Sequence, residues 1–577
     1  MTEPPGDRSS DAWPVPAMAP VEMEGNGRHR LRAPSSGDHG HHAPSRGTST
    51  ATTAALLLMT GNVLSRLFGL IREQLASAHF GTGDAMAAFT VADNVHTLLF
   101  DLAVSGMLQA ALIPVLARWA GADAAHRAEL RRISGALVTL VFVVVGAAVV
   151  VGVWRAPAVV HAMTSLVTDR QPRSPETVDL TVTLVRWILP AVLLLSVSTV
   201  MMAVLHAIGR VTAPAMSLAL RNVAIVGAIL LLAGRLGVRS MAIGVLAGAA
   251  LILLSLIGPL RRADALPRPN LHLRHPAVRE VLGLYVPIFL GLLVSTVATV
   301  ADRNLGWNAG ENALGAMRYA TTLVQLLLGL VAAAISLAAL PTLARHHAAG
   351  DIAAFRGTLG RALAMTTVLI LPATFGLAAV AVPTVDLVFH HGATDAAGAR
   401  AIVVALLGYL PGTLFAAYDQ VLIFAFYARR NTRTPVVVGI IAVGVYFAVA
   451  LSMVHALGML GLVLANSAQF IAHGLLMWWL AERTFGPIAT PALVRVVRRT
   501  AAAAGGAAIL AWMTWVALRW QHAAPMGDGL QGEVTLAGVP MLAGAAVYLA
   551  AVRIAGIGEV TDLWVVLKAR ISRYGDR

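Results

Sequence analysis

The stretch AALIPVLARW (Ala110–Trp119) returns later in the chain as LAALPTLARH (Leu337–His346). The proline, the Leu-Ala-Arg triplet and the spacing between them are the same in both, at an offset of 227 residues. A proline followed at this distance by an arginine is a specific arrangement, so the match suggests that a part of the chain is present twice.

Two further matches follow in the same order along the chain. RAPAVV (155–160) corresponds to AVPTVD (381–386) at an offset of 226 residues. The segment 189–214, which begins LPAVLL and ends HAIGRVTAP, corresponds at an offset of 221 residues to 410–435, which begins LPGTLF and ends YARRNTRTP. Three collinear matches predict an internal duplication.

The composition is that of a polytopic membrane protein. Of the 577 residues, 57% are hydrophobic and only 12% are charged, and the mean hydropathy is +0.74. A soluble domain usually carries about 25% charged residues. Residues 1–50 are the exception, because they are polar and rich in Pro, Ser, Gly and His, and we expect them to be a disordered cytoplasmic tail.

Apolar runs long enough to cross a bilayer follow the tail. We place them near 52–79, 85–116, 133–154, 178–208, 211–234, 240–260, 280–303, 312–342, 358–383, 398–427, 435–456, 459–481, 499–519 and 534–556. The sequence therefore predicts an all-α membrane protein with about 14 transmembrane helices.

The basic residues orient these spans. If the loops alternate between the two sides of the membrane, 30 of the 43 arginine and lysine residues lie on the side of the tail and 7 on the other side. The positive-inside rule then places both termini in the cytoplasm. The same rule explains the net charge of +14 without a nucleic-acid partner.

The duplication predicts how the spans are grouped. Each copy has six spans, an even number, so both copies have the same orientation and are related by an axis along the membrane normal. We expect an N-lobe (51–265) and a C-lobe (266–484) around a central cavity. Residues 485–577 would add two more spans and a cytoplasmic C-terminal end.

The first predicted span contains three charges, in SRLFGLIREQ (65–74). A charge at bilayer depth costs at least about 2.5–3.5 kcal/mol, so Arg66, Arg72 and Glu73 should face the cavity rather than lipid. The alternative is a local pair between Arg66 and Glu73, which are seven residues apart on one helix face. In both cases we expect Arg72 to remain unpaired within its helix, to line the cavity and to be the residue most needed for transport.

Two other spans carry polar stripes at a spacing of three to four residues. The second span has Asn94, Thr97, Asp101, Ser105 and Gln109, and the eighth has Arg318, Thr321, Thr322 and Gln325. Because these spans are equivalent in the two copies, we expect the stripes to face each other across the cavity. Polar packing between helices is the alternative.

The seventh and twelfth spans carry further polar residues. Asp302 and Arg303 end the seventh, and either a coupling-cation site at Asp302 or a local ion pair would explain them. Asn466, Gln469 and His473 form a stripe in the twelfth, for which we favour hydrogen bonds between helices. The sequence has no P-loop, zinc-ligand spacing, Asp-rich diphosphate motif or cysteine, so we expect neither an enzyme nor a cofactor.

Several of these motifs resemble the MurJ/MviN family of the multidrug/oligosaccharidyl-lipid/polysaccharide exporter superfamily, over about residues 52–560. The first span is similar to the family signature at Ser65, Arg66, Gly69, Arg72, Glu73, Phe80 and Gly81. PVLARW (114–119), ADR (301–303), RYA (318–320), ALPTLAR (339–345), TP (434–435) and the pair Pro214 and Asn222 also fit.

The resemblance implies a flippase of the bacterial cytoplasmic membrane. Its substrate would be lipid II, the undecaprenyl-pyrophosphate-linked peptidoglycan precursor, or a related polyprenyl-linked glycan. Membrane lipids and cell-wall synthesis proteins are the partners it suggests. The cavity residues expected to bind the substrate are Arg66, Arg72, Glu73, Asp101, Arg318 and Gln325.

The chain departs from the family pattern in three places. Where the second span of the family usually has a basic pair and then Glu-Gly, this chain has Phe100, Asp101, Ser105 and Gly106. Where the eighth has Asp-Arg and a following Glu, it has Thr321, Thr322 and Gln325. Asp302 matches an acid of the family's sodium site, but the eleventh span has no carboxylate or amide. Two alternatives therefore stay open, a non-transporting scaffold for envelope assembly and another exporter of the superfamily.

Overall fold

The computed structural model describes residues 46–104, 106–121, 123–165, 173–521 and 529–556, and over these residues all regular structure is α-helical. Of the predicted tail, residues 1–45 lie outside the described residues. So do Ser105 of the second-span stripe and the C-terminal end from residue 557.

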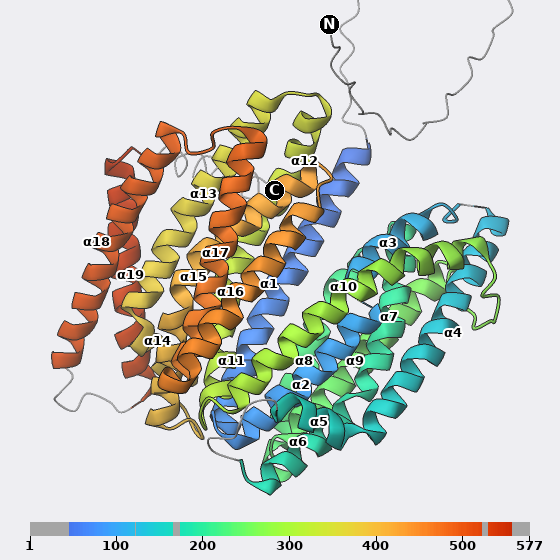
Figure 1. Cartoon of the computed structure of the whole chain (residues 1–577), viewed down its shortest axis with the longest axis horizontal. Helices are drawn as coiled ribbons and strands as arrows, with labels where there is room; N and C mark the ends of the chain where they lie inside the picture. Colours follow the sequence, from blue (N-terminus) through green and yellow to red (C-terminus); the bar gives the residue numbers. More distant parts are fainter. Residues whose placement is uncertain (1–45, 105, 122, 166–172, 522–528, 557–577) are drawn as a thin grey trace, which may run out of the picture. The chain divides into compact units, whose positions relative to one another are not determined.

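The helices follow the chain order in Figure 1. Those within the first predicted copy are α1 (Arg46–Phe80), α2 (Asp84–Val104), α3 (Gly106–Ala117), α4 (Ala124–Trp154), α5 (Ala156–Thr164), α6 (Pro175–Ile188), α7 (Pro190–Ala207), α8 (Thr212–Leu236) and α9 (Arg239–Arg262). Those within the second are α10 (Pro276–Trp307), α11 (Ala313–Leu330), α12 (Ala332–Ala348), α13 (Ile352–Ala379), α14 (Ala381–Phe389), α15 (Ala396–Ala428), α16 (Arg433–Leu457) and α17 (Met459–Phe485). The chain continues into α18 (Pro491–Gln521) and α19 (Leu530–Ile554).

Within the described residues, twelve helical segments are long and apolar enough to cross a membrane. The predicted spans 52–79 and 280–303 lie in α1 and α10, which are 35 and 32 residues long but are not among these twelve. The multi-span helical fold is thus confirmed, whereas the count of fourteen stays a prediction.

Two helices end at equivalent places in the two copies. Helices α8 and α16 both end at a glycine in the left-handed region, Gly237 with φ of 55° and Gly458 with φ of 54°. Glycine is the residue that adopts this conformation without a steric penalty, so both turns use the same local chemistry.

The matched prolines of the third repeated segment, Pro190 and Pro411, have different effects on their helices. Pro190 begins a new helix, α7, whereas Pro411 lies inside the continuous helix α15. The Ser467 hydroxyl of α17 bridges α15 at this point, since it donates to the Gly408 carbonyl at 2.5 Å and accepts from the Gly412 N–H at 3.1 Å. A side chain inserted into the helix ladder lets α15 pass the proline without leaving these two backbone groups unsatisfied.

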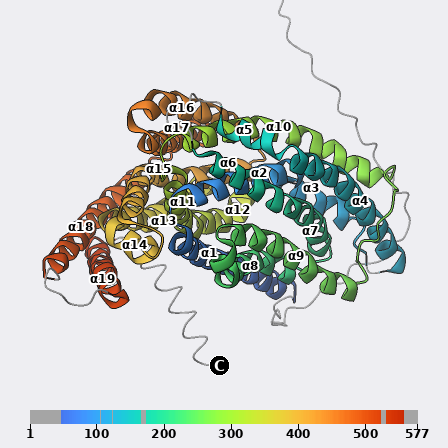
Figure 2. The ribbon, with the colours of Figure 1, turned by 90° about the horizontal axis from the view of Figure 1, so that it is seen from below.

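Three helices do not fit the simple division into two copies. Helix α10, the first of the second copy, packs on α2, α3 and α5 of the first copy. Helices α18 and α19 pack against each other and against α13 and α14 at the edge of the second copy, as Figure 2 shows. The lobe boundaries 51–265 and 266–484 therefore stay a prediction from the repeat.

The turn between α1 and α2 is anchored to the second copy. The Tyr319 hydroxyl of α11 donates to the Gly81 carbonyl at 2.9 Å, and the Ala393 N–H donates to the Ala78 carbonyl at 2.8 Å. The Thr82 hydroxyl also donates to Asn312 Oδ1 at 2.7 Å. These bonds fix α1 against α11 and so determine which side chains of the two helices meet.

Candidate functional site

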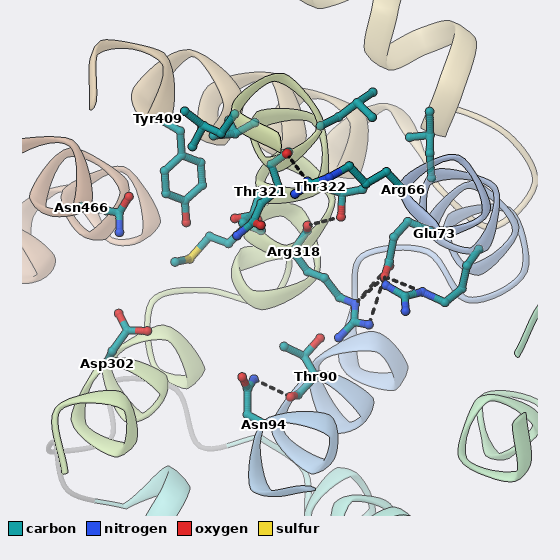
Figure 3. Close-up of a pocket in the computed structure, with 18 of the residues that line it drawn as sticks. Arg66, Glu73, Thr90, Asn94, Asp302, Arg318, Thr321, Thr322, Tyr409 and Asn466 are labelled. Carbon is teal, nitrogen blue, oxygen red and sulfur yellow. Dashed lines mark hydrogen bonds and ion pairs between the residues drawn. The ribbon is translucent and has the colours of Figure 1, made fainter. Parts of the chain in front are cut away.

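A polar cavity of about 540 Å³ lies where helices of the two copies meet. It is lined by side chains of α1, α2, α10, α11, α15 and α17, and Figure 3 shows its principal residues. A volume of this size is in the range of small-molecule sites.

Glu73 is the centre of a charged cluster on the cavity wall. Its carboxylate, 1% exposed, accepts hydrogen bonds from Arg72 Nε at 3.0 Å and from Arg318 Nε and Nη2 at 3.0 Å each. Arg318 Nη1 donates to Asp93 Oδ2 at 3.0 Å. Arg318 of α11 therefore joins carboxylates on α1 and α2, as Figure 3 shows for Glu73.

Helix α8 supports this cluster from behind. Arg72 Nη1 donates to Asn222 Oδ1 at 3.0 Å, and Asn222 Nδ2 donates to the Ser65 carbonyl at 2.8 Å. Arg221 Nη2 lies 3.6 Å from Asp93 Oδ1. Asn222 of α8 binds Arg72 at Nη1, and Glu73 binds it at Nε and Nη2, so this guanidinium has a fixed position and a carboxylate partner.

Arg66 has different surroundings. Its Nη1 donates to the main-chain carbonyl of Gln325 at 2.5 Å, near the C-terminal end of α11, where the helix dipole favours a cation. The guanidinium lies directly over Gly329, because a Cβ there would be 1.7 Å from Arg66 Cζ. Among the described residues, no carboxylate forms an ion pair with Arg66.

The predicted pairing in the first span is therefore wrong. The Arg66–Glu73 pair was the alternative to cavity exposure, and Arg72 was expected to remain unpaired within its helix, but Glu73 pairs with Arg72. The physical reason is tertiary: Asn222 and Arg318 draw Arg72 and Glu73 together, while Gly329 opens a space that takes Arg66 away. Both arginines line the cavity.

The eighth-span stripe lies entirely on the cavity wall. Arg318, Thr321, Thr322 and Gln325 all line it. The second-span stripe does so only in part: Asn94 lines the cavity, whereas Thr97 and Asp101 are exposed and are not among its lining residues. The Gln109 side chain lies outside what the structure describes.

Asp93 is a site residue that the sequence reasoning missed. It is adjacent to Asn94 and one position off the stripe, so the spacing of three to four residues does not include it. A carboxylate in the apolar stretch FTVADNVHTLLF was itself the available signal, since such a group rarely lacks a function or a partner.

Asp302 forms the local ion pair that was the alternative to a coupling-cation site. Arg303 Nε lies 3.5 Å from Asp302 Oδ2, and the Tyr446 hydroxyl donates a hydrogen bond to Oδ1. A cation at Asp302 stays a hypothesis for a sodium-replacement experiment. Tyr446 lies in the eleventh span, which has no carboxylate or amide, so its phenol is the polar group that this span brings to Asp302.

The twelfth-span stripe divides between two roles. Asn466 lines the cavity. His473 Nδ1 lies 2.7 Å from Asp419 Oδ1 of α15, which confirms the predicted hydrogen bond between helices. The Asp419 partner had not been identified from the sequence.

The lining of the cavity is positively charged. Among the described residues, four arginines (Arg66, Arg72, Arg303 and Arg318) and two carboxylates (Glu73 and Asp302) line it, an excess of two positive charges. Planar guanidinium groups bind phosphate oxygens in pairs, so this wall is suited to an anionic phosphate group.

The chain is similar to known proteins over most of its length. The family model for the lipid II flippase MurJ matches residues 76–526. The lipid II flippase MurJ of Burkholderia cenocepacia is 29% identical over 435 residues, which cover 74% of this chain and 82% of the relative. The probable lipid II flippase MurJ of Haemophilus influenzae is 29% identical over 393 residues, with coverages of 66% and 76%.

Solved structures show the same fold. A lipid II flippase MurJ in an inward closed conformation matches with a TM-score of 0.72 at 19% identity, covering 86% of this chain and 98% of that one. An inward-facing multidrug transporter of the MATE family matches with a TM-score of 0.62 at 14% identity, with coverages of 75% and 98%. The apolar helices and the sequence matches together place the chain among multi-pass proteins of the bacterial inner membrane. The chain belongs to the lipid II flippase MurJ family.

Proposed function

We propose that this protein flips lipid II from the cytoplasmic to the outer leaflet by alternating access, with both termini in the cytoplasm. The observation that carries the proposal is the cavity wall, with its excess of arginines and with Arg66 free of a carboxylate partner among the described residues. The pyrophosphate of lipid II is an anion for which such a wall is complementary.

Arg66 is the residue that we propose for the first contact with the pyrophosphate. Its only hydrogen bond to a described residue is to a neutral main-chain carbonyl, so its charge is not balanced locally. Arg72 and Arg318 are neutralised in part by Glu73, and an anion has to compete with that carboxylate to reach them.

The basic residues that the family usually has in the second and eighth spans are replaced here by Phe100, Asp101 and Thr322. Arg318 lies one helical turn from Thr322 and brings a guanidinium into the same cavity. We propose that Arg318 takes over part of the lost anion binding. Retention of a basic cavity favours transport over the scaffold alternative, and the family matches do not favour a different exported substrate.

The test is lipid II translocation by the purified full-length protein in liposomes, measured as lipid II accessible on the opposite leaflet. We expect wild-type protein to translocate lipid II and Arg66→Ala to do so much more slowly. Arg186→Ala is the matched control, because Arg186 is also inside a span but is exposed and is not among the cavity-lining residues. If wild-type protein translocates lipid II no faster than protein-free liposomes do, and also fails to complement a flippase-depleted cell, the scaffold alternative is favoured.

A further inference from the structure

Arg318 connects the second copy to two carboxylates of the first. Its Nε and Nη2 donate to Glu73, and its Nη1 donates to Asp93 Oδ2, all at 3.0 Å. All three nitrogens of the guanidinium therefore already face a carboxylate. An anionic headgroup that binds Arg318 has to replace at least one of them.

The two carboxylates differ in what they retain after such a replacement. Glu73 keeps its hydrogen bonds from Arg72. Asp93 keeps only Arg221, at 3.6 Å, and its buried Oδ1 has no hydrogen-bond partner among the described residues. A buried carboxylate without hydrogen bonds is strongly unfavourable, so Asp93 is the one that needs compensation.

His96 lies one helical turn from Asp93 and is positioned to provide it. The side chain is 2% exposed, and neither ring nitrogen has a hydrogen-bond partner among the described residues. Its Nδ1 lies 3.9 Å from Asp93 Oδ1. Buried polar atoms are nearly always hydrogen-bonded, so this arrangement points to a group that acquires its partner in another state.

We propose that Asp93 and His96 form a proton-binding site that is filled when the anionic headgroup replaces Asp93 at Arg318. The inference rests on the proposed function, because the headgroup is that of the transported lipid. The proton is taken up from the buffered solvent and is held between Asp93 Oδ1 and His96 Nδ1. It neutralises the Asp93 carboxylate, whose charge Arg318 no longer compensates.

The charges around the pair determine the sign of the effect. The charged groups next to the Asp93–His96 pair are Arg221 on α8 and Arg318 on α11. Also on the same cavity wall are Arg72 and Glu73 on α1, and Asp302 and Arg303 on α10. Helices α5, α6 and α7 also pack on α2 and carry His161, Glu176, Asp179 and Arg186, which are exposed, and His206, which is half-buried. While Arg318 is bound to Asp93, the arginines disfavour a proton; after Arg318 binds the headgroup, the proton is favoured.

Because coupling between two ligands is reciprocal, headgroup binding should take up a proton and should strengthen as the pH falls. The test is calorimetric titration of the full-length protein in nanodiscs with lipid II, in PIPES and in imidazole buffer. The difference in heat between the two buffers gives the number of protons bound. We expect about one proton per lipid in wild type and about none in Asp93→Asn, between about pH 6 and 8.

The amide oxygen that Asp93→Asn introduces can still accept a hydrogen bond from Arg318, so the fold should be retained, and thermal unfolding checks this. His96→Gln is the second variant, and it should lower the proton uptake and move it to lower pH. Asp179→Asn, on an exposed carboxylate of α6, should behave as wild type.

Lipid II binding by wild type without proton uptake over this pH range would overturn the inference, as would full uptake by Asp93→Asn. Neither result would affect the proposed function. Absence of both lipid II binding and translocation in wild type would instead contradict the proposed function itself.

Discussion

The two copies of the repeat contribute to one cavity, but they contribute different chemistry. The first copy supplies Arg66, Arg72 and Glu73, whereas most polar side chains from the second are neutral, among them Thr321, Thr322, Gln325, Tyr409 and Asn466. Yet α8 and α16 end at equivalent places, with Gly237 and Gly458 in almost the same conformation. The two copies have thus kept the same helix arrangement and turns, while their charged residues have changed independently.

The second copy does hold charges, but it holds them in pairs. Asp302 is next to Arg303, and Arg318 is bound to carboxylates of the first copy. In the first copy, Arg66 is bound only to a carbonyl among the described residues. The first copy should therefore dominate anion binding, and the following variants test this difference.

The largest effect is expected for Arg66→Ala. Because a hydrogen bond to a charged group contributes about 1.5–3 kcal/mol, loss of the unpaired guanidinium should lower lipid II translocation by about 10- to 100-fold. Arg66→Lys should recover only a part, since a point charge lacks the planar fork. The measurement is the initial rate in liposomes. A larger loss in Arg72→Ala than in Arg66→Ala would restore the ranking that the sequence alone suggested.

A smaller loss, about tenfold, is expected for Gly329→Ala, because the new Cβ would meet Arg66 Cζ at 1.7 Å and force the guanidinium away. Gly227→Ala is the matched control, as nothing lies within 4 Å of a Cβ at that helical glycine. In the double variant Arg66→Ala/Gly329→Ala, the second change should add nothing to the first. Additive losses would show that Gly329 acts through another residue.

Ser467→Ala should destabilise the second copy by about 1–3 kcal/mol, because it leaves the Gly408 carbonyl and the Gly412 N–H without the bridging hydroxyl. The measurement is the midpoint of thermal unfolding in detergent. Ser452→Ala, at an exposed hydroxyl of α16, should leave the midpoint unchanged. Equal midpoints for both variants would mean that the bridge across Pro411 is not needed.

The smallest effect is expected when sodium is replaced by potassium in the translocation assay. Asp302 already interacts with Arg303 and Tyr446, and replacing the cation in solution leaves both interactions intact. We therefore expect the translocation rate to change by less than about twofold. Asp302→Asn provides the comparison, because a sodium dependence that disappears only in this variant would place a cation at Asp302 after all.

Much of the frame could be predicted from the sequence, because it follows from composition and repetition. Apolar runs of sufficient length predicted the membrane-spanning helices. The stripe at Arg318 was also informative, since a spacing of three to four residues determines a helix face.

The pairing of the charges could not be predicted in the same way. Helix geometry placed Arg66 and Glu73 on one face, but the partners that decide the outcome, Asn222 and Arg318, are 150 and 245 residues away from the α1 residues they bind. Arg72 and Glu73 are adjacent in the sequence and so point to different sides of the helix, but their long side chains still reach each other. Asp93 was missed for the related reason that its importance comes from Arg318, in the other copy.

The contact between Arg66 and Gln325 determines which substitutions this part of the sequence can tolerate. The acceptor is a main-chain oxygen, so a change of side chain at position 325 leaves the hydrogen bond in place. This is consistent with glutamine at a position where the family resemblance implies glutamate. Position 329 has no such freedom, because any side chain would occupy the space of the guanidinium. Among homologues that keep Arg66, substitutions should therefore accumulate at 325 and be absent at 329.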